Sequence, residues 1–218
     1  MSLYVLEGLD GSGKGTQFKL LMQRLINDGE NCIKIDFPNY ESNSSALVKM
    51  YLNGEFSQNP KDVNAYAVST FYAVDRFASF QKDWKQDYLD GKTIIANRYV
   101  SSNIVFQMTK LPKDKWDKFI SWLDNLEHEK FGLPRADKVI YLDMPIHISQ
   151  KLMSNRYDGD ESKKDIHESN LNFLQECREC ALYAAKKLDW TVINCGLGDK
   201  PRTIDDISDE LYNLIKNL

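Results

Sequence analysis

The sequence has 218 residues, of which 42% are hydrophobic and 28% are charged, the proportions of an ordinary globular protein. Its formal net charge of -4 gives no general attraction to nucleic acid or to an anionic membrane, so any phosphate binding must be local. We find no apolar run long enough to span a bilayer and no signal peptide, and we therefore expect one cytoplasmic domain over residues 1–218.

The first structural signal is a short strand followed at once by a glycine-rich loop. Residues 3–6 are apolar strand formers, and a helical pattern begins directly after the loop Gly8-Leu9-Asp10-Gly11-Ser12-Gly13-Lys14-Gly15-Thr16. Glycines let several backbone N–H groups converge on one anion, and a helix start adds unpaired donors. Lys14 would bring a full charge to the phosphates. An ordinary glycine-rich turn is the alternative, but this context favours a phosphate loop.

Strands and helices alternate along the rest of the chain. After the strand at 3–6, the pattern predicts four more, at 32–37, 92–96, 138–143 and 190–195. Between and after them it predicts helices at 13–27, 45–53, 62–89, 101–109, 113–130, 146–153 and 167–188, and a last helix capped by Thr203. This alternation is typical of an α/β fold in which helices cover both faces of a five-stranded parallel sheet. Ligands of such sheets gather at the carboxyl ends of the strands.

Two further features of the pattern concern mobility and metal binding. Residues 154–166 are polar and carry alternating charges, which predicts a mobile lid that includes Arg156, Lys163 and Lys164. Cys177 and Cys180 form a C-x-x-C pair, but they lie in a helical segment without a second pair. We therefore expect them on a buried helix flank rather than at a zinc ion.

Two arginines stand among apolar and aromatic neighbours. Arg98 follows the third strand, and Arg76 lies within the long helix at 62–89. A half-buried guanidinium needs an anion, and its forked donors suit a phosphate. A structural carboxylate is the alternative partner for either arginine. Beside a phosphate loop, a second phosphate site is favoured.

Joined in this order, the motifs resemble those of the thymidylate kinase family of P-loop nucleoside monophosphate kinases. The resemblance spans essentially the whole chain and rests on the phosphate loop and four further segments, which are Phe37-Pro38, residues 72–76, residues 97–103, and the lid with its flanks at 156–158 and 163–168. It implies a P-loop nucleotide kinase architecture in which the lid closes over the substrates. The implied reaction uses ATP and Mg²⁺ to convert dTMP to dTDP, for the synthesis of dTTP. The family is usually dimeric, which implies a homodimer.

The resemblance also implies roles for residues around the acceptor. Asp10 would hold the 3′-hydroxyl, and Phe37 would line the acceptor pocket. Tyr72 would stack on thymine, unless the register places Phe71 there. Arg98 would grip the acceptor phosphate.

The remaining implied roles concern the base, the sugar and the transferred group. Arg76 would contact the thymine and the edge of its pocket, and Asn103 would read the pyrimidine edge. Phe106 would lie against the 2′ position of the sugar and disfavour ribonucleotides. Lys14 and Arg156 would join Arg98 in surrounding the transferred phosphoryl group, Arg156 from the lid. Gly11 occupies a loop position that is arginine in some relatives.

Departures from the family pattern surround the metal. Gly15 replaces the hydroxyl residue that normally follows the lysine, which leaves Thr16 as the expected metal contact. Asn97 replaces an aspartate that helps to organise the water shell of magnesium. The arginine that often follows the Phe-Pro pair is also absent, because Asn39 stands there.

Three other interpretations stay open at this point. The chain could be another nucleotide kinase, acting on AMP, dUMP or a deoxynucleoside. A hydroxyl acceptor needs a general base whereas a phosphate does not, so Asn97 argues for a monophosphate acceptor. The chain could also be a P-loop ATP-binding protein that transfers to no acceptor, or a relative that binds nucleotides without catalysis.

Overall fold

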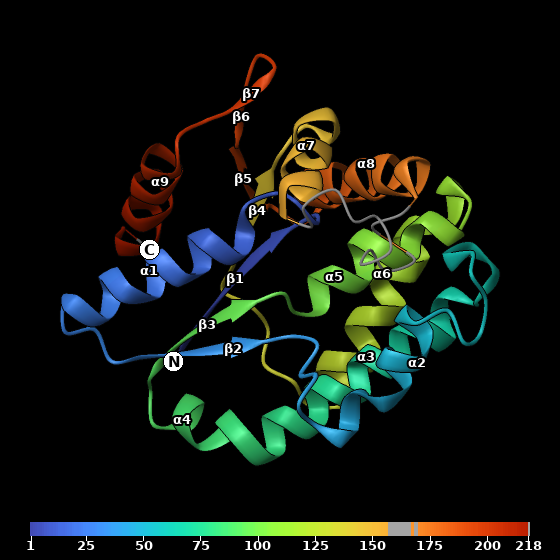
Figure 1. Ribbon diagram of the computed structural model, residues 1–218. Coiled ribbons are helices and arrows are strands. Elements are labelled where there is room, and N and C mark those ends of the chain that lie inside the picture. Colours follow the sequence, from blue (N-terminus) through green and yellow to red (C-terminus); the bar gives the residue numbers. More distant parts are fainter. Residues whose placement is uncertain (157–166, 168–169, 218) are drawn as a thin grey trace.

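The computed structural model describes residues 1–156, 167 and 170–217, and a five-stranded parallel sheet forms its centre (Figure 1). The strands lie in the order β2-β3-β1-β4-β5 and are β1 (Ser2–Gly8), β2 (Cys32–Asp36), β3 (Thr93–Asn97), β4 (Lys138–Asp143) and β5 (Thr191–Asn194). The predicted parallel sheet is confirmed. Because all five strands run the same way, their carboxyl ends meet at one edge, where ligands of such sheets bind.

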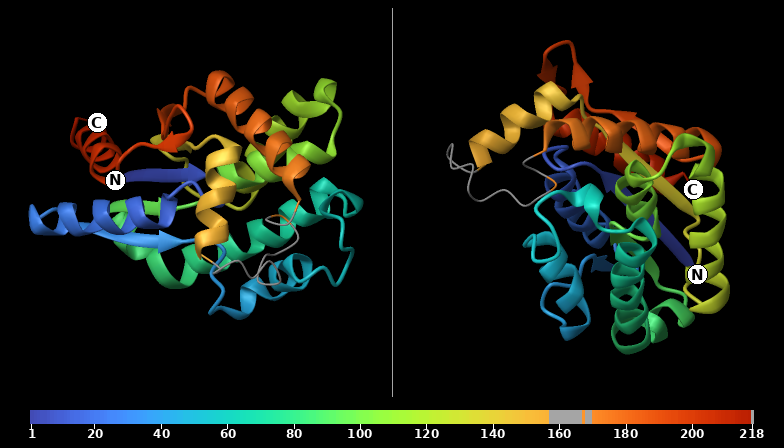
Figure 2. Two further views of the ribbon diagram at one scale, coloured as in Figure 1. Left: turned by 45° about the horizontal axis from the view of Figure 1, so that its top comes forward. Right: turned by 90° about the vertical axis from the view of Figure 1, so that its right-hand side faces the viewer.

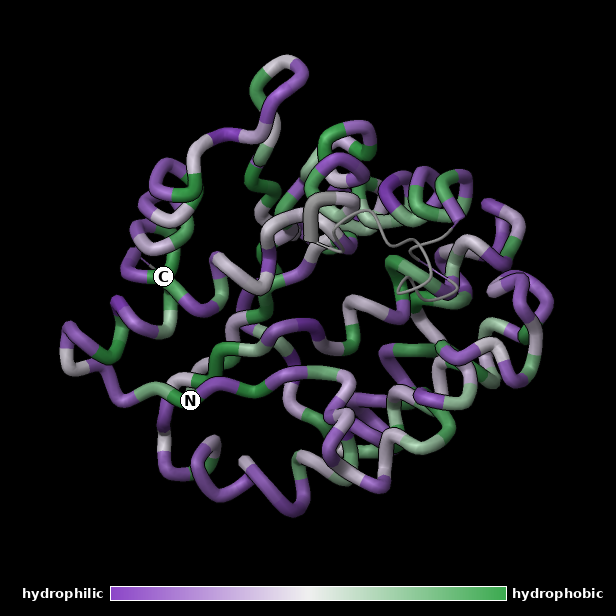
Figure 3. Tube along the Cα trace, viewed as in Figure 1, coloured by the Kyte–Doolittle hydropathy of each residue, from purple (hydrophilic) through white to green (hydrophobic). Residues whose placement is uncertain are grey.

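One face of the sheet is covered by α1 (Lys14–Asn27) and α9 (Ile204–Lys216). Their buried side chains, such as Leu21 and Leu211, pack with strand residues such as Ile140 in one hydrophobic cluster. Hydrophilic and hydrophobic positions alternate along both helices, as amphipathic helices require (Figure 3). Thr203 caps α9 as predicted, since its hydroxyl accepts a hydrogen bond from the Asp206 amide at 3.1 Å.

Helices on the opposite face form a second core with the same strands (Figure 2). They are α3 (Ala65–Ser79), α5 (Val100–Gln107), α6 (Trp116–Asp124) and α8 (Leu171–Lys187). The two long predicted helices each contain a π-helical turn, at Phe80–Trp84 and at Asn125–Lys130, and α4 (Lys85–Leu89) continues beyond the first. The period of these turns differs from the 3.6 residues that sequence patterns detect, so they were not predicted.

The smaller elements surround the carboxyl edge of the sheet. They are α2 (Ala46–Leu52), α7 (Ile146–Arg156), the two-stranded hairpin of β6 (Gly196–Leu197) and β7 (Lys200–Pro201), and 3-10 turns at Asn43–Ser45, Pro60–Asp62, Met108–Lys110 and Lys113–Lys115. The hairpin was not predicted, because strands of two residues are too short to carry an alternating pattern.

Two expectations about the helices can be compared with the structure. Cys177 and Cys180 are free thiols fully buried on α8, in agreement with the prediction. Within the described part of the chain, no helix combines the length and the apolar character needed to cross a membrane.

Candidate active site

The phosphate loop joins β1 to α1 and is closely covered by α7. Gly11 and Gly13 both have positive φ, at 75° and 81°, which an L side chain rarely adopts. A Cβ atom on Gly11 would lie 2.6 Å from the Ser149 carbonyl oxygen and 2.8 Å from Met153 Cγ. Glycine at position 11 is therefore what allows α7 to pack against the loop, and the arginine of some relatives would require α7 to move.

A cavity of about 610 Å³ opens above the phosphate loop. Every residue from Asp10 to Thr16 lines it, whereas Gly8 lies at the end of β1 and donates its amide hydrogen to Glu7 Oε1. The side-chain oxygen of Ser12 is buried and has no hydrogen-bond partner within the described residues. Pro201 and Arg202 also line this cavity. The loop thus borders a cavity that includes the side chain of Lys14, as an anion site would.

Arg98 is the charged centre of the carboxyl edge. It has a φ of 67°, a strained value for a residue with a side chain, and its amide is tied to the Leu6 carbonyl at 2.9 Å. Its Nη1 donates to Glu7 Oε1 at 3.1 Å, and its Nη2 donates to Asp10 Oδ1 at 2.7 Å. The guanidinium carbon also lies 5.0 Å from the centre of the Phe106 ring.

These neighbours shift the pKa of each charged group at the centre. Burial opposes the charge of Arg98, but Asp10 and Glu7 outweigh it and raise the pKa of the guanidinium. Burial would also raise the pKa of Asp10, and Arg98 and Lys14 reverse this and lower it. Burial lowers the pKa of Lys14 to about 8, with Arg98 adding to the effect. All three groups therefore remain charged at neutral pH.

A second, smaller cavity of about 80 Å³ lies on the other side of Asp10. Its lining includes the predicted acceptor residues Tyr72, Arg98, Asn103 and Phe106. The Phe71 ring instead packs against Phe56, with their centres 5.8 Å apart, so the register that puts Tyr72 at the cavity is the one observed. Asp10 lines both cavities.

The predicted acceptor residue Phe37 lies in a different place. It is only 3% exposed and its ring centre lies 6.1 Å from that of Tyr99, in the hydrophobic core. Pro38 and Tyr40 line the cavity at this point of the chain.

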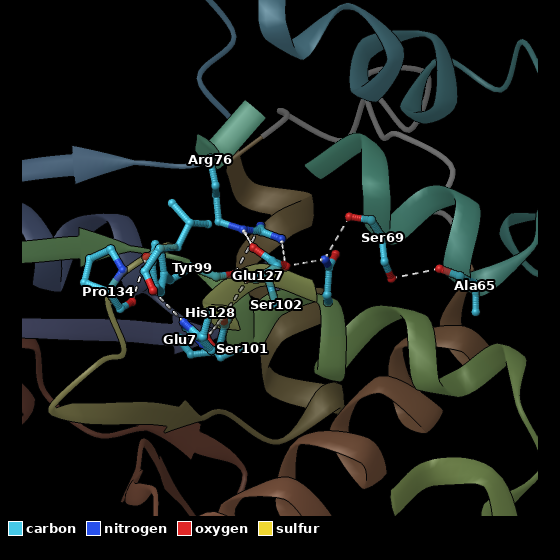
Figure 4. Close-up of polar contacts among 12 residues, drawn as sticks. Glu7, Ala65, Ser69, Arg76, Tyr99, Ser101, Ser102, Glu127, His128 and Pro134 are labelled. Carbon is cyan, nitrogen blue, oxygen red and sulfur yellow. Dashed lines mark hydrogen bonds and ion pairs between the residues drawn. The ribbon is translucent and has the colours of Figure 1, made fainter. Parts of the chain in front are cut away.

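Arg76 also departs from its expected role at the base. It is 1% exposed, and its Nε and Nη2 each donate to a different oxygen of Glu127 at 2.6 Å (Figure 4). Glu127 is fully buried in the second π-helical turn, where it also accepts from Asn103 Nδ2 at 3.2 Å. The structural carboxylate, which the sequence left as the alternative partner, is thus the observed one. The predicted contact of Arg76 with thymine is corrected, since Glu127 engages the guanidinium in the core.

Sequence reasoning missed three more side chains at this edge. Glu7 is fully buried, and its Oε2 accepts hydrogen bonds from the hydroxyls of Ser101 and Ser102. Gln107 lines the acceptor cavity, is 1% exposed, and has a buried Oε1 with no partner in the described part of the chain. Gln107 lies one helical turn after Asn103, and this spacing on one helix face could have identified it.

His167 is the third missed residue, and it lies in the acceptor cavity lining. Its ring stacks on Phe106 with centres 5.3 Å apart, and Tyr51 Oη lies 2.9 Å from its Nε2. Burial lowers the pKa of His167 to about 3, so the ring is neutral. Three scattered histidines form no pattern, and the only signal for His167 was its place in the 163–168 segment that resembles the family.

The predicted lid falls largely outside the described residues. The backbone of Arg156 ends α7, but its side chain, together with Lys163 and Lys164, lies outside them. Leu152 and Met153, in the last described turns of α7, line the cavity above the phosphate loop.

Comparison with known proteins identifies the family. The family model described as thymidylate kinase matches residues 6–199, which include the phosphate loop, the whole lining of the smaller cavity and most of the chain. The chain belongs to this family. Thymidylate kinase from Plasmodium falciparum is 27% identical over 188 residues, which cover 85% of this chain and 83% of the relative.

Other thymidylate kinases align over nearly the full chain. The enzyme from Schizosaccharomyces pombe is 25% identical, with 99% of this chain and 92% of the relative covered. A solved structure of thymidylate kinase from Candida albicans superposes with a TM-score of 0.71 at 22% identity, covering 99% of this chain and 91% of that one. This structural likeness concerns the fold, and it agrees with the parallel sheet described above.

Proposed function

We infer that this thymidylate kinase transfers the terminal phosphoryl group of ATP to dTMP, giving ADP and dTDP. The observation that carries the inference is the shared position of Asp10, which lines the large cavity above the phosphate loop and the small cavity around Arg98. A donor in the first cavity and an acceptor in the second would meet at this residue, as in-line transfer requires.

Arg98 is proposed to bind the acceptor phosphate. Glu7 holds one side of its guanidinium, while Nη2 points to Asp10 between the cavities. An entering phosphate would accept from Nη2 in place of Asp10, and Asp10 would then be able to accept from the 3′-hydroxyl. Two carboxylates keep Arg98 charged, so that it offsets the charge that spreads over the transferred group.

The base and sugar are proposed to occupy the remainder of the small cavity. Tyr72 offers an aromatic face, and Asn103 and Gln107 bring amide groups to the cavity that a pyrimidine edge could bind. The unpartnered Oε1 of Gln107 supports this reading, because a buried oxygen without a donor is costly unless a ligand supplies one. Phe106 would lie against the 2′ position of the sugar.

The cavity above the loop is proposed to hold ATP with Mg²⁺. Lys14 and the loop amides would bind the phosphates, and the exposed Thr16 hydroxyl offers one oxygen ligand for the metal. The described residues contain no group of three or more acidic, histidine or cysteine side chains that could hold a metal alone. This fits Mg²⁺, which takes few protein oxygens and keeps several waters beside the nucleotide. When bound, the ion would neutralise phosphate charge.

The chemistry asks the protein for alignment and charge rather than for a base. A monophosphate acceptor is already ionised, and the side chain at the end of β3, Asn97, is a neutral amide that cannot take a proton. The lid, with Arg156, would close over the two nucleotides and exclude the water that could otherwise hydrolyse ATP.

Steady-state turnover of dTMP, dUMP, AMP and thymidine, each with ATP and Mg²⁺, tests this function. We expect kcat/KM to be highest for dTMP. A preference for AMP would indicate a different nucleotide kinase, and ATP hydrolysis that is indifferent to every acceptor would indicate a P-loop ATPase.

We also propose that the protein forms a homodimer. Val74 and Phe77 are exposed apolar residues on α3, and a second copy could cover them. Sedimentation velocity should give the mass of a dimer, and Phe77→Lys should shift it towards the monomer.

A further inference from the structure

Three acidic side chains end strands at the ligand-binding edge, and two of them are already engaged by arginines. Glu7, near the end of β1, binds Arg98. Asp143, at the end of β4, accepts from Arg178 Nε and Nη2 at 2.7 Å each. Asp36, which ends β2, differs from both because it is exposed and its Oδ1 accepts from the neutral amide of Asn97 at 2.8 Å.

Asn97 connects this exposed carboxylate to the phosphate loop. Its Oδ1 accepts from Lys14 Nζ at 2.9 Å, and its Nδ2 donates to Asp36. A lysine only donates and a carboxylate only accepts, so this arrangement also fixes the orientation of the amide. The negative charge of Asp36 in turn favours the charged form of Lys14.

The pairing of β2 with β3 explains why the amide and the carboxylate occur together. Asp36 and Asn97 are partners in the parallel register, so their side chains lie next to one another. Two aspartates at these positions would repel each other. The amide of Asn97 avoids this repulsion, and in this chain the negative charge of the pair lies on β2.

We propose that Asp36 orients the hydrated Mg²⁺ of bound ATP by accepting hydrogen bonds from its water ligands, while Asn97 positions Lys14. The proposal rests on the proposed function, because it takes the cavity above the loop to be the MgATP site. Mg²⁺ in phosphate-transfer sites commonly has an aspartate beside the loop hydroxyl. Asp36 is the strand-end carboxylate that no arginine engages among the described residues, and one amide separates it from the loop lysine.

The test measures how much Mg²⁺ strengthens nucleotide binding in the absence of an acceptor. Calorimetry gives the Kd of a non-hydrolysable ATP analogue in Mg²⁺ and in EDTA. The effect of Asp36 on Lys14 is present in both conditions, so the ratio of the two Kd values reports the contribution of the metal alone. We expect Asp36→Asn to reduce this ratio about tenfold, the usual cost of losing an outer-shell partner of a metal. The exchange variant Asp36→Asn/Asn97→Asp should restore the ratio, since it returns the charge to the neighbouring strand.

Two controls accompany the measurement. Asp83→Asn removes an exposed aspartate on the first π-helical turn and should leave the ratio unchanged. Electron paramagnetic resonance, which detects free Mn²⁺, gives a second readout when Mn²⁺ replaces Mg²⁺. It measures how tightly the complex of protein and ATP analogue holds the metal. An unaltered ratio in folded Asp36→Asn, or an exchange variant that stays as weak as the single variant, overturns the proposal. Because the binding measurement contains no acceptor, its outcome does not depend on whether the protein phosphorylates dTMP. The two proposals can therefore fail separately.

Discussion

The buried ion pair between Arg76 and Glu127 allows a direct choice between a structural and a substrate-binding role. Both side chains are buried, at 1% and 0% exposure, and two hydrogen bonds of 2.6 Å join them. Either Arg76→Met or Glu127→Leu leaves its partner charged and unpaired in the core. We expect each single change to lower the free energy of unfolding by about 3–5 kcal/mol.

The double variant Arg76→Met/Glu127→Leu should recover most of that loss. Apolar side chains of similar volume can replace a buried ion pair at little or no cost, because neither charge then has to be desolvated. Asn103 would lose its bond to Glu127, but its Nδ2 would keep the Ser69 carbonyl at 3.1 Å. We therefore expect a coupling energy of about 3 kcal/mol between the two sites and a Kd for dTMP that stays within about tenfold of wild type.

Urea unfolding followed by tryptophan fluorescence and calorimetric titration with dTMP measure the two quantities. Arg135→Met is a suitable control, since Arg135 is half exposed in its pairs with Asp124 and Glu129 and should matter by less than about 1 kcal/mol. An Arg76→Met variant that unfolds like the wild type yet loses its affinity for dTMP would refute the structural role. That result would mean that Arg76 leaves Glu127 to contact the substrate.

Three further predictions concern the acceptor cavity. Phe106→Ala should raise kcat/KM for the ribonucleotide counterpart of dTMP about tenfold relative to kcat/KM for dTMP. An equal loss of kcat/KM for both nucleotides would argue against a contact with the 2′ position. Gln107→Met should weaken dTMP binding in calorimetry without loss of stability, because its Oε1 has no protein partner among the described residues. Burial lowers the pKa of His167 from 6.5 to about 3, so below pH 6.5 the unfolded chain binds a proton that the folded protein does not. The free energy of unfolding in urea should therefore fall by about 2 kcal/mol between pH 6.5 and 5. His167→Phe should reduce this dependence on pH.

The elements with long regular patterns were predictable from the sequence. Strand β4 coincides with the predicted residues 138–143, and Thr203 caps α9 where its hydroxyl and the following acidic residues indicate. The phosphate loop was equally clear, because a strand, three closely spaced glycines, a lysine and a helix start are adjacent in the chain. Each of these signals is local, so it can be recognised without knowing which distant segments meet in the fold.

Partners that are distant in sequence could be assigned only from the tertiary structure. The apolar neighbours of Arg76 predict burial but not which anion receives it, and Glu127 is 51 positions away. Phe37 and Pro38 are adjacent in the chain, yet the phenyl ring of Phe37 lies in the core whereas Pro38 lines the cavity. The link from Lys14 through Asn97 to Asp36 likewise depends on the order of the strands, which the sequence alone did not specify.

The phosphate loop, the parallel α/β fold and the set of polar residues at the strand ends could all be predicted from the chain. How those residues pair depends on the fold, because a charged side chain binds whichever partner the packing of strands and helices brings beside it. In this chain Arg76, which was predicted to contact the substrate, pairs with Glu127 in the core. Asp36 is linked to Lys14 of the phosphate loop through the amide of Asn97.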